Sequence, residues 1–136
     1  MGSITLRWIE KTMMMASDSN GHSIVIGRSP DPEFVWSGVK PSDLLLVAAA
    51  SCSCHDVVEI LAKQREPLQD MKVICTGEQN NEPPYRFTQL HLKFMAYGPV
   101  KAERVEKAIQ LSVEKYCSVI NSLNMPVSTE FEIITE

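Results

Sequence analysis

The sequence feature that most constrains the fold is an alanine-rich apolar segment over residues 41–65. Its first half contains LLLVAAASC, which is apolar on every side of a helix and therefore suits a helix that is buried all round. Pro41 fits the first helical position, where its missing N–H costs nothing, and Asp43 complements the positive end of the helix dipole. Pro67 prevents the helix from continuing. The segment predicts a central helix from about residue 41 to residue 65.

Composition and charge exclude several classes of protein. The longest uninterrupted apolar run, residues 44–50, has seven residues, whereas a membrane-spanning helix needs about 20. We therefore expect no transmembrane segment and no membrane partner. Thirteen Lys and Arg against 17 Asp and Glu give a net charge of -4, which argues against binding to nucleic acid.

The N-terminus and the cysteines point to a reducing compartment. The sequence MGSITLRWIEKT lacks the basic head and apolar middle of a signal peptide. We therefore expect a cytoplasmic protein, in which the four cysteines are buried or reactive thiols rather than structural disulfides.

Alternating or β-branched segments on both sides of the central helix predict strands. Before the helix they are residues 4–8, 13–16 and 22–26; after it they are residues 71–76, 90–96 and, near the C-terminus, 130–135. Asn20 and Gly21 suit a type I′ hairpin between the second and third strands, with both residues at positive φ. Residues 29–41 carry three prolines and predict an extended surface loop.

A second helix completes the predicted order. Apolar residues recur at helical spacing over residues 105–116, and residues 118–123 predict a further short helical turn. The resulting order is β(3)-α-β(2)-α-β, an α+β fold. We expect a single domain over residues 1–136, because a chain of this length buries a sizeable core without metals or disulfides.

Two cysteines lie near the middle of the predicted central helix. Cys52 and Cys54 are two residues apart, so they point about 200° away from each other and only one of them can line a given pocket. Cys52 shares its helix face with His55 and Asp56, where a titratable group could polarise its thiol. The plainer interpretation is that both cysteines are small core residues.

The sequence gives little support for a metal or a cofactor. The spacing C-x-C-H formed by Cys52, Cys54 and His55 fits no usual zinc motif, so we expect no metal. Neither a glycine-rich phosphate loop nor a G-x-S-x-G elbow is present, which disfavours nucleotide and serine hydrolysis. We expect no cofactor.

The remaining two cysteines occupy different settings. Cys117 lies between the second helix and the following helical turn, and a thiol at a helix N-terminus is favoured as thiolate by the dipole and the free backbone donors. The alternative is again a small buried residue. Cys75 faces inward on a predicted strand, so we assign it to the core.

The run GVKPSDLLLVAAASCSCHDVVEILAKQ, the later cysteine in KYCSV and the strand order around them resemble the OsmC/Ohr superfamily, the osmotically inducible protein C and organic hydroperoxide resistance proteins. The resemblance covers essentially the whole chain. It implies an OsmC-like fold in which two long helices pack against antiparallel sheets in an intertwined homodimer. It also implies thiol-dependent reduction of organic hydroperoxides, with a hydroperoxide as substrate and a dithiol as reductant. Cys52 then matches the peroxide-attacking cysteine and Cys117 the resolving cysteine.

Several positions depart from the pattern of the peroxidases in this superfamily. These proteins usually carry a glutamate after the helix-starting proline, paired with an arginine that holds the thiolate, whereas this chain has Ser42 followed by Asp43. The resemblance makes Arg28 the candidate for the activating cation, oriented by Asp43, with His55 as the fallback. The proline that usually follows the second cysteine is replaced by Ser118.

Two functional hypotheses follow from the sequence. ASCSCHDVV is closer to the GCxxxDVV motif of a less characterised branch of the superfamily than to the peroxidase branches. The first hypothesis is a two-cysteine peroxidase that uses Cys52 and Cys117. The second is a non-catalytic dimer that binds a hydrophobic small molecule or senses the thiol redox state.

Overall fold

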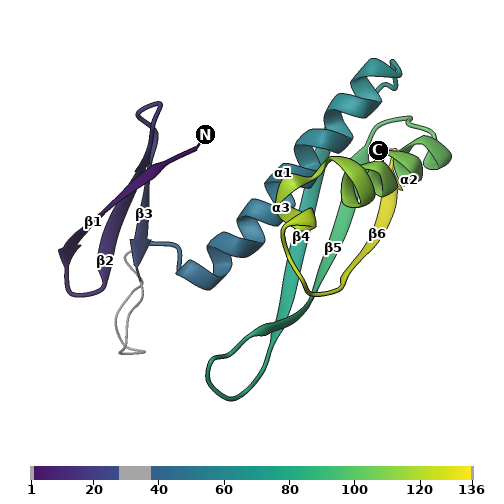
Figure 1. Ribbon diagram of the computed structural model, residues 1–136. Coiled ribbons are helices and arrows are strands. Elements are labelled where there is room, and N and C mark those ends of the chain that lie inside the picture. The colour runs from purple at the N-terminus through teal and green to yellow at the C-terminus, as the bar shows by residue number, and fades with distance from the viewer. Residues whose placement is uncertain (1, 28–37, 136) are drawn as a thin grey trace. The chain divides into compact units, whose positions relative to one another are not determined.

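The first three strands form an antiparallel sheet. The computed structural model describes residues 2–27 and 38–135 and divides into two units, Met1–Leu45 and Leu46–Glu136. In the first unit, β1 (Ile4–Glu10), β2 (Met13–Asp18) and β3 (Ser23–Gly27) pair in the order β1-β2-β3 (Figure 1). The three predicted strands are confirmed. The predicted loop over residues 29–41 lies mostly outside the described residues, and the single-domain assignment stays a prediction.

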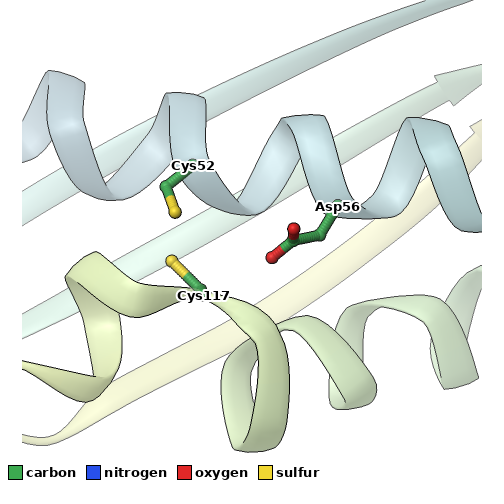
Figure 2. Close-up of side chains that lie close together, drawn as sticks. All are labelled: Cys52, Asp56 and Cys117. Carbon is green, nitrogen blue, oxygen red and sulfur yellow. The ribbon is translucent and has the colours of Figure 1, made fainter.

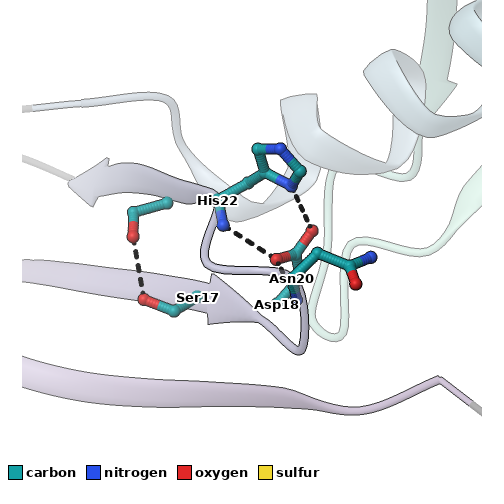
Figure 3. Close-up of polar contacts among 5 residues, drawn as sticks. Ser17, Asp18, Asn20 and His22 are labelled. Atoms are coloured by element: carbon teal, nitrogen blue, oxygen red, sulfur yellow. Dashed lines mark hydrogen bonds and ion pairs between the residues drawn. The ribbon is translucent and has the colours of Figure 1, made fainter.

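The turn between β2 and β3 is not the type I′ hairpin that the sequence predicts. Gly21 has a φ of +87°, whereas Asn20 does not have a positive φ. The Asp18 N–H donates to the carbonyl of His22 at 2.9 Å, so three residues form the loop, and the loop ends in a left-handed glycine. The cause is the Asp18 side chain (Figure 3). Its carboxylate accepts hydrogen bonds from the N–H groups of Asn20 at 2.9 Å and His22 at 2.8 Å, which stabilises the longer loop.

Helix α1 (Pro41–Lys63) begins in the first unit and lies mostly in the second. It ends two residues before the predicted boundary because Arg65 adopts a left-handed conformation, with a φ of 57°. The Arg65 N–H donates to the carbonyl of Ala62, and the Glu66 N–H donates to the carbonyl of Leu61. This pair of hydrogen bonds is a Schellman motif, which satisfies the last carbonyls of the helix.

One stripe of α1 is buried, rather than all of its faces. The buried residues recur every fourth position: Ala49, Ser53, Val57 and Leu61. Val47 and Val58 are 52% and 39% exposed. By length and composition alone α1 is long and apolar enough to cross a membrane, but the core helix of a soluble protein passes the same test. Within the described residues, the apolar surface around Val47 and Val58 therefore lacks a cover.

The second unit contains a three-stranded sheet that carries most of the core. Strands β4 (Asp70–Gln79), β5 (Phe87–Tyr97) and β6 (Val127–Ile134) pair in the order β4-β5-β6. The central strand buries one face, made of Leu90, Leu92, Phe94 and Ala96. These residues were predicted to point inward by their alternation. They join the α1 stripe in one hydrophobic cluster.

The chain between β5 and β6 is helical and accounts for a difference in the sheet. The predicted second helix is resolved into α2 (Ala102–Leu111) and a π-helical turn η1 (Ser112–Tyr116), followed by α3 (Ser118–Asn121). This crossover returns β6 parallel to β5, whereas β4 and β5 are antiparallel. The expectation of purely antiparallel sheets was wrong at this pairing. The α+β class and the order β(3)-α-β(2)-α-β are confirmed.

Candidate functional site

Cys52, Asp56 and Cys117 converge between α1 and the start of α3 (Figure 2). Cys52 and Asp56 are four residues apart on α1 and therefore share a helix face, as the sequence predicts. The two sulfur atoms and a carboxylate oxygen of Asp56 all lie within 4.8 Å of one another. Both cysteines are free thiols. The structure thus brings together the two cysteines that were singled out as a pair, and adds a carboxylate to them.

The π-helical turn η1 positions Cys117. The N–H of Cys117 donates to the carbonyl of Ser112, five residues earlier, at 2.7 Å. The backbone then becomes extended at Cys117, with φ -74° and ψ 104°, and the Cys117 sulfur accepts the N–H of Ile120 at 3.4 Å. π-Helical turns often occur at functional sites. Here the turn delivers the thiol to the face of α1 that carries Cys52.

A buried chain of hydroxyl groups holds the Asp56 carboxylate. The hydroxyl of Ser112 donates to Oδ2 of Asp56 at 2.8 Å, and the Oγ atoms of Ser53 and Ser112 are 2.8 Å apart. Because a hydroxyl has a single proton, Ser112 donates it in the hydrogen bond to the carboxylate and accepts a hydrogen bond from the Ser53 hydroxyl. Ser53 and Ser112 are both fully buried. These two serines were not among the residues singled out from the sequence. The available signal was a serine in each of two otherwise apolar helical stripes.

The environment of Cys52 favours its thiolate. Burial on its own would raise the pKa of this thiol, but hydrogen bonds from the Val119 backbone, the Cys117 thiol and the Ser118 hydroxyl hold the pKa below its usual value. The Asp56 carboxylate opposes this effect. Among the described residues, the groups that lower the pKa are hydrogen-bond donors around the start of α3.

Cys117 has the opposite character, which corrects the expectation that its position would favour a thiolate. Its side chain is fully buried, and burial raises the pKa of the thiol to about 11. The hydrogen bond from the Ile120 N–H acts in the other direction but is smaller. Desolvation therefore outweighs the helix N-terminus, and Cys117 stays protonated at neutral pH.

Three other residues were singled out from the sequence, and two of them have ion-pair partners of their own. Arg28 lies outside the described residues. Asp43 belongs to the first unit and pairs with Nζ of Lys40 at 3.8 Å. His55 is exposed, with Nε2 3.4 Å from a carboxylate oxygen of Glu59.

Cys54 and Cys75 are half-buried and stand apart from the Cys52 group. Burial raises the pKa of both thiols. Within the described part of the chain, Cys54 and His55 do not belong to the group that Cys52 forms with Asp56 and Cys117. Two thiols and a carboxylate are ligand types that bind zinc, but Cys52, Asp56 and Cys117 supply only three of the four ligands of a closed structural zinc site.

A hollow of about 480 Å³ includes Asp56 in its lining. Its other lining residues come from the second half of α1 and the residue after it, and from the ends of α2 and η1: Glu59, Ile60, Lys63, Gln64, Leu111 and Tyr116. The carboxylate of the site is therefore adjacent to a surface cavity rather than sealed in the core.

Comparisons with known proteins agree on one family. The family model described as OsmC-like protein matches residues 34–132. The Escherichia coli K12 protein YhfA is 36% identical over 125 residues, which cover 90% of each chain.

Solved structures extend the likeness to the whole chain. A hypothetical protein from Aquifex aeolicus VF5 is 31% identical, with a TM-score of 0.81 over 98% of this chain and 97% of the other. The organic hydroperoxide resistance protein OhrB of Bacillus subtilis is 12% identical, with a TM-score of 0.66 over 98% of this chain and 97% of the other. The second likeness is one of fold alone.

Proposed function

We propose that this chain, which belongs to the OsmC-like protein family, is a thiol-dependent peroxidase. It reduces organic hydroperoxides with Cys52 and Cys117. The observation that carries the proposal is the pairing of two free thiols with opposite pKa shifts and sulfurs within 4.8 Å. A peroxidase of this type needs one cysteine that reacts as thiolate and a second that waits as thiol. Cys52 and Cys117 fit these two roles.

The chemistry proceeds in three steps. The Cys52 thiolate attacks the peroxide oxygen that is remote from the organic group, and the O–O bond breaks to give a sulfenic acid and an alcohol after the alkoxide takes a proton. Cys117 then attacks the sulfur of the sulfenic acid, forming a disulfide and releasing water. An external dithiol restores both thiols by exchange. Closure requires the sulfurs to approach to about 2.05 Å.

A homodimer is part of the proposal. OsmC-like proteins are typically dimeric, and this chain exposes apolar side chains that a second copy would cover. Val47 and Val58 are exposed on α1, and Leu6 and Trp8 on β1 are 51% and 70% exposed. Light scattering is expected to give about twice the chain mass of 15.2 kDa; a stable species of the chain mass would contradict this. A cytoplasmic location fits the four free thiols.

The second candidate function is a non-catalytic dimer that binds a hydrophobic small molecule or senses the thiol redox state. The replacement of the expected glutamate by Ser42 favours it.

Thiol counting separates the two functions. Reduced protein receives one equivalent of cumene hydroperoxide, and free thiols are counted before and after. Wild type is expected to lose two thiols, Cys52→Ser none, and Cys117→Ser one, as a sulfenic acid that dimedone traps. Cys54→Ser is the matched control on the same helix and should behave as wild type. A wild-type protein that keeps all four thiols would favour the non-catalytic dimer.

A further inference from the structure

The resolving step needs a proton acceptor. Cys117 is fully buried, and with a pKa of about 11 only about one molecule in 10⁴ carries its thiolate at pH 7. Disulfide closure requires this sulfur to lose its proton as it attacks Cys52. A base placed beside the two sulfurs would remove that obstacle.

We propose that the Asp56 carboxylate is the catalytic base of the resolving step, taking the proton of Cys117 as the disulfide forms. This inference rests on the proposed function of the two cysteines. Asp56 is the one carboxylate that the described residues bring within 4.8 Å of both sulfurs. That separation is within reach of a hydrogen bond after a rotamer change or through one water molecule.

The proton balance closes within the site. The S–S bond forms between Cys117 and Cys52 while the S–O bond of the sulfenic acid breaks. The Cys117 proton goes to the Asp56 carboxylate, and the leaving hydroxide takes it back from the carboxylic acid to become water. When an external dithiol reopens the disulfide at the Cys52 sulfur, the proton of its attacking thiol passes to the Asp56 carboxylate and from there to the Cys117 thiolate that leaves.

The buried serines explain why this carboxylate is suited to the role. Ser112 donates to Oδ2, which orients the carboxylate beside the two sulfurs. Ser53 in turn fixes the hydroxyl of Ser112. Ser112 also accepts the Cys117 N–H through its backbone carbonyl, so a single residue positions both the base and the thiol that it serves. Ser53 and Ser112 are positioning residues, whereas Asp56 faces the reacting atoms.

The test compares the two chemical steps in Asp56→Asn, which keeps the shape of the side chain and an oxygen that can accept the Ser112 hydrogen bond. Sulfenic acid formation is measured by dimedone trapping in the Cys117→Ser background, and disulfide closure by rapid quench and mass spectrometry. We expect the first step to be unchanged or faster, because the Asp56 charge opposes the Cys52 thiolate. The second step should slow about 10²-fold or more. Glu59→Gln removes a carboxylate one turn further along α1 and should alter neither step.

A second oxidant separates this inference from the proposed function. Oxidised dithiothreitol forms a mixed disulfide at Cys52, which Cys117 closes without any hydroperoxide, so the same proton transfer is tested. If wild type closes its disulfide with oxidised dithiothreitol but ignores hydroperoxides, the peroxidase function fails and the Asp56 comparison still stands. Closure at the wild-type rate in Asp56→Asn, or an equal slowing of both steps, would overturn the inference. If Asp56→Asn does not fold, closure in wild type is compared in H₂O and D₂O, and an equal rate in both solvents would overturn it.

Discussion

Replacing Ser112 by alanine is expected to destabilise the protein strongly, although it removes a single oxygen atom. Ser112 is fully buried and its hydroxyl makes two hydrogen bonds, one to the Asp56 carboxylate and one with Ser53, each at 2.8 Å. The backbone bond from the Cys117 N–H to its carbonyl is retained in the variant. The change therefore isolates the side-chain network.

The magnitude follows from the two hydrogen bonds. A bond to a charged group contributes about 1.5–3 kcal/mol and a neutral one about 0.5–1.5 kcal/mol. Ser112→Ala should therefore lower the free energy of unfolding by about 2–4 kcal/mol. Ser53→Ala removes only the neutral bond and should cost about 1 kcal/mol. Ser51→Ala is the matched control on α1, because its exposed hydroxyl donates to the Ala48 carbonyl of the same helix, and its effect should stay within about 0.5 kcal/mol.

Urea unfolding followed by far-ultraviolet circular dichroism measures these differences. All variants are compared reduced and at one protein concentration, because association contributes to apparent stability. The slope of free energy against urea should be unchanged. In a double-mutant cycle, adding Ser53→Ala to Ser112→Ala should cost little more, since the Ser53 bond is already lost. A Ser112→Ala protein as stable as Ser51→Ala would refute the network.

Three further predictions concern the thiols and one tight turn. Iodoacetamide at neutral pH should alkylate Cys52 before the other three cysteines, since its pKa alone is lowered, and peptide mass spectrometry would detect any other order. The raised pKa of Cys117 contributes stability that is fully present below pH 9 and lost as the pH rises toward about 11, at about 1.4 kcal/mol per pH unit. Alkaline urea titrations should show this loss in wild type and lack it in Cys117→Ala. Gly98→Ala should lower the free energy of unfolding by at least about 1 kcal/mol, because φ is +121° and a Cβ would lie 2.5 Å from the Pro67 carbonyl oxygen. Gly2→Ala is the control: its Cβ would meet nothing within 4 Å, so the change should be neutral.

The secondary structure was predictable where apolar periodicity is strong. The alternation in β5 and the alanine-rich stretch of α1 each specify one kind of element, and both were placed correctly. The hairpin type was not predictable from Asn20 and Gly21, because the Asp18 carboxylate competes for the same backbone donors. The direction of β6 depends on the length and path of the crossover, which local periodicity does not specify.

The sequence predicts which two cysteines meet at the candidate site, but not the pKa shifts of their thiols. Helical spacing places Asp56 on the face of Cys52, so one half of the site follows from residue numbers alone. The protonation state of Cys117 does not follow from residue numbers. It depends on whether tertiary packing leaves the sulfur exposed or buries it, and in the structure the sulfur is buried. The roles of Ser53 and Ser112 likewise depend on the contact between two helical segments. In the sequence, each serine on its own resembles an ordinary small core residue.

The π-helical turn η1 lets this stretch of the chain lose one residue without displacing Cys117. Its i to i-5 hydrogen bond accommodates one residue more than an α-helical turn would. If a single residue were deleted between 112 and 116, the turn would close as an α-helix with the Cys117 N–H still bonded to the Ser112 carbonyl, and the thiol would stay on the face of Cys52. The same deletion in a regular α-helix would rotate each later residue by about 100° around the axis and shift it by about 1.5 Å. A change of one residue in the length of this turn is therefore expected to preserve the paired cysteines, whereas the same change within α1 before Cys52 would separate them.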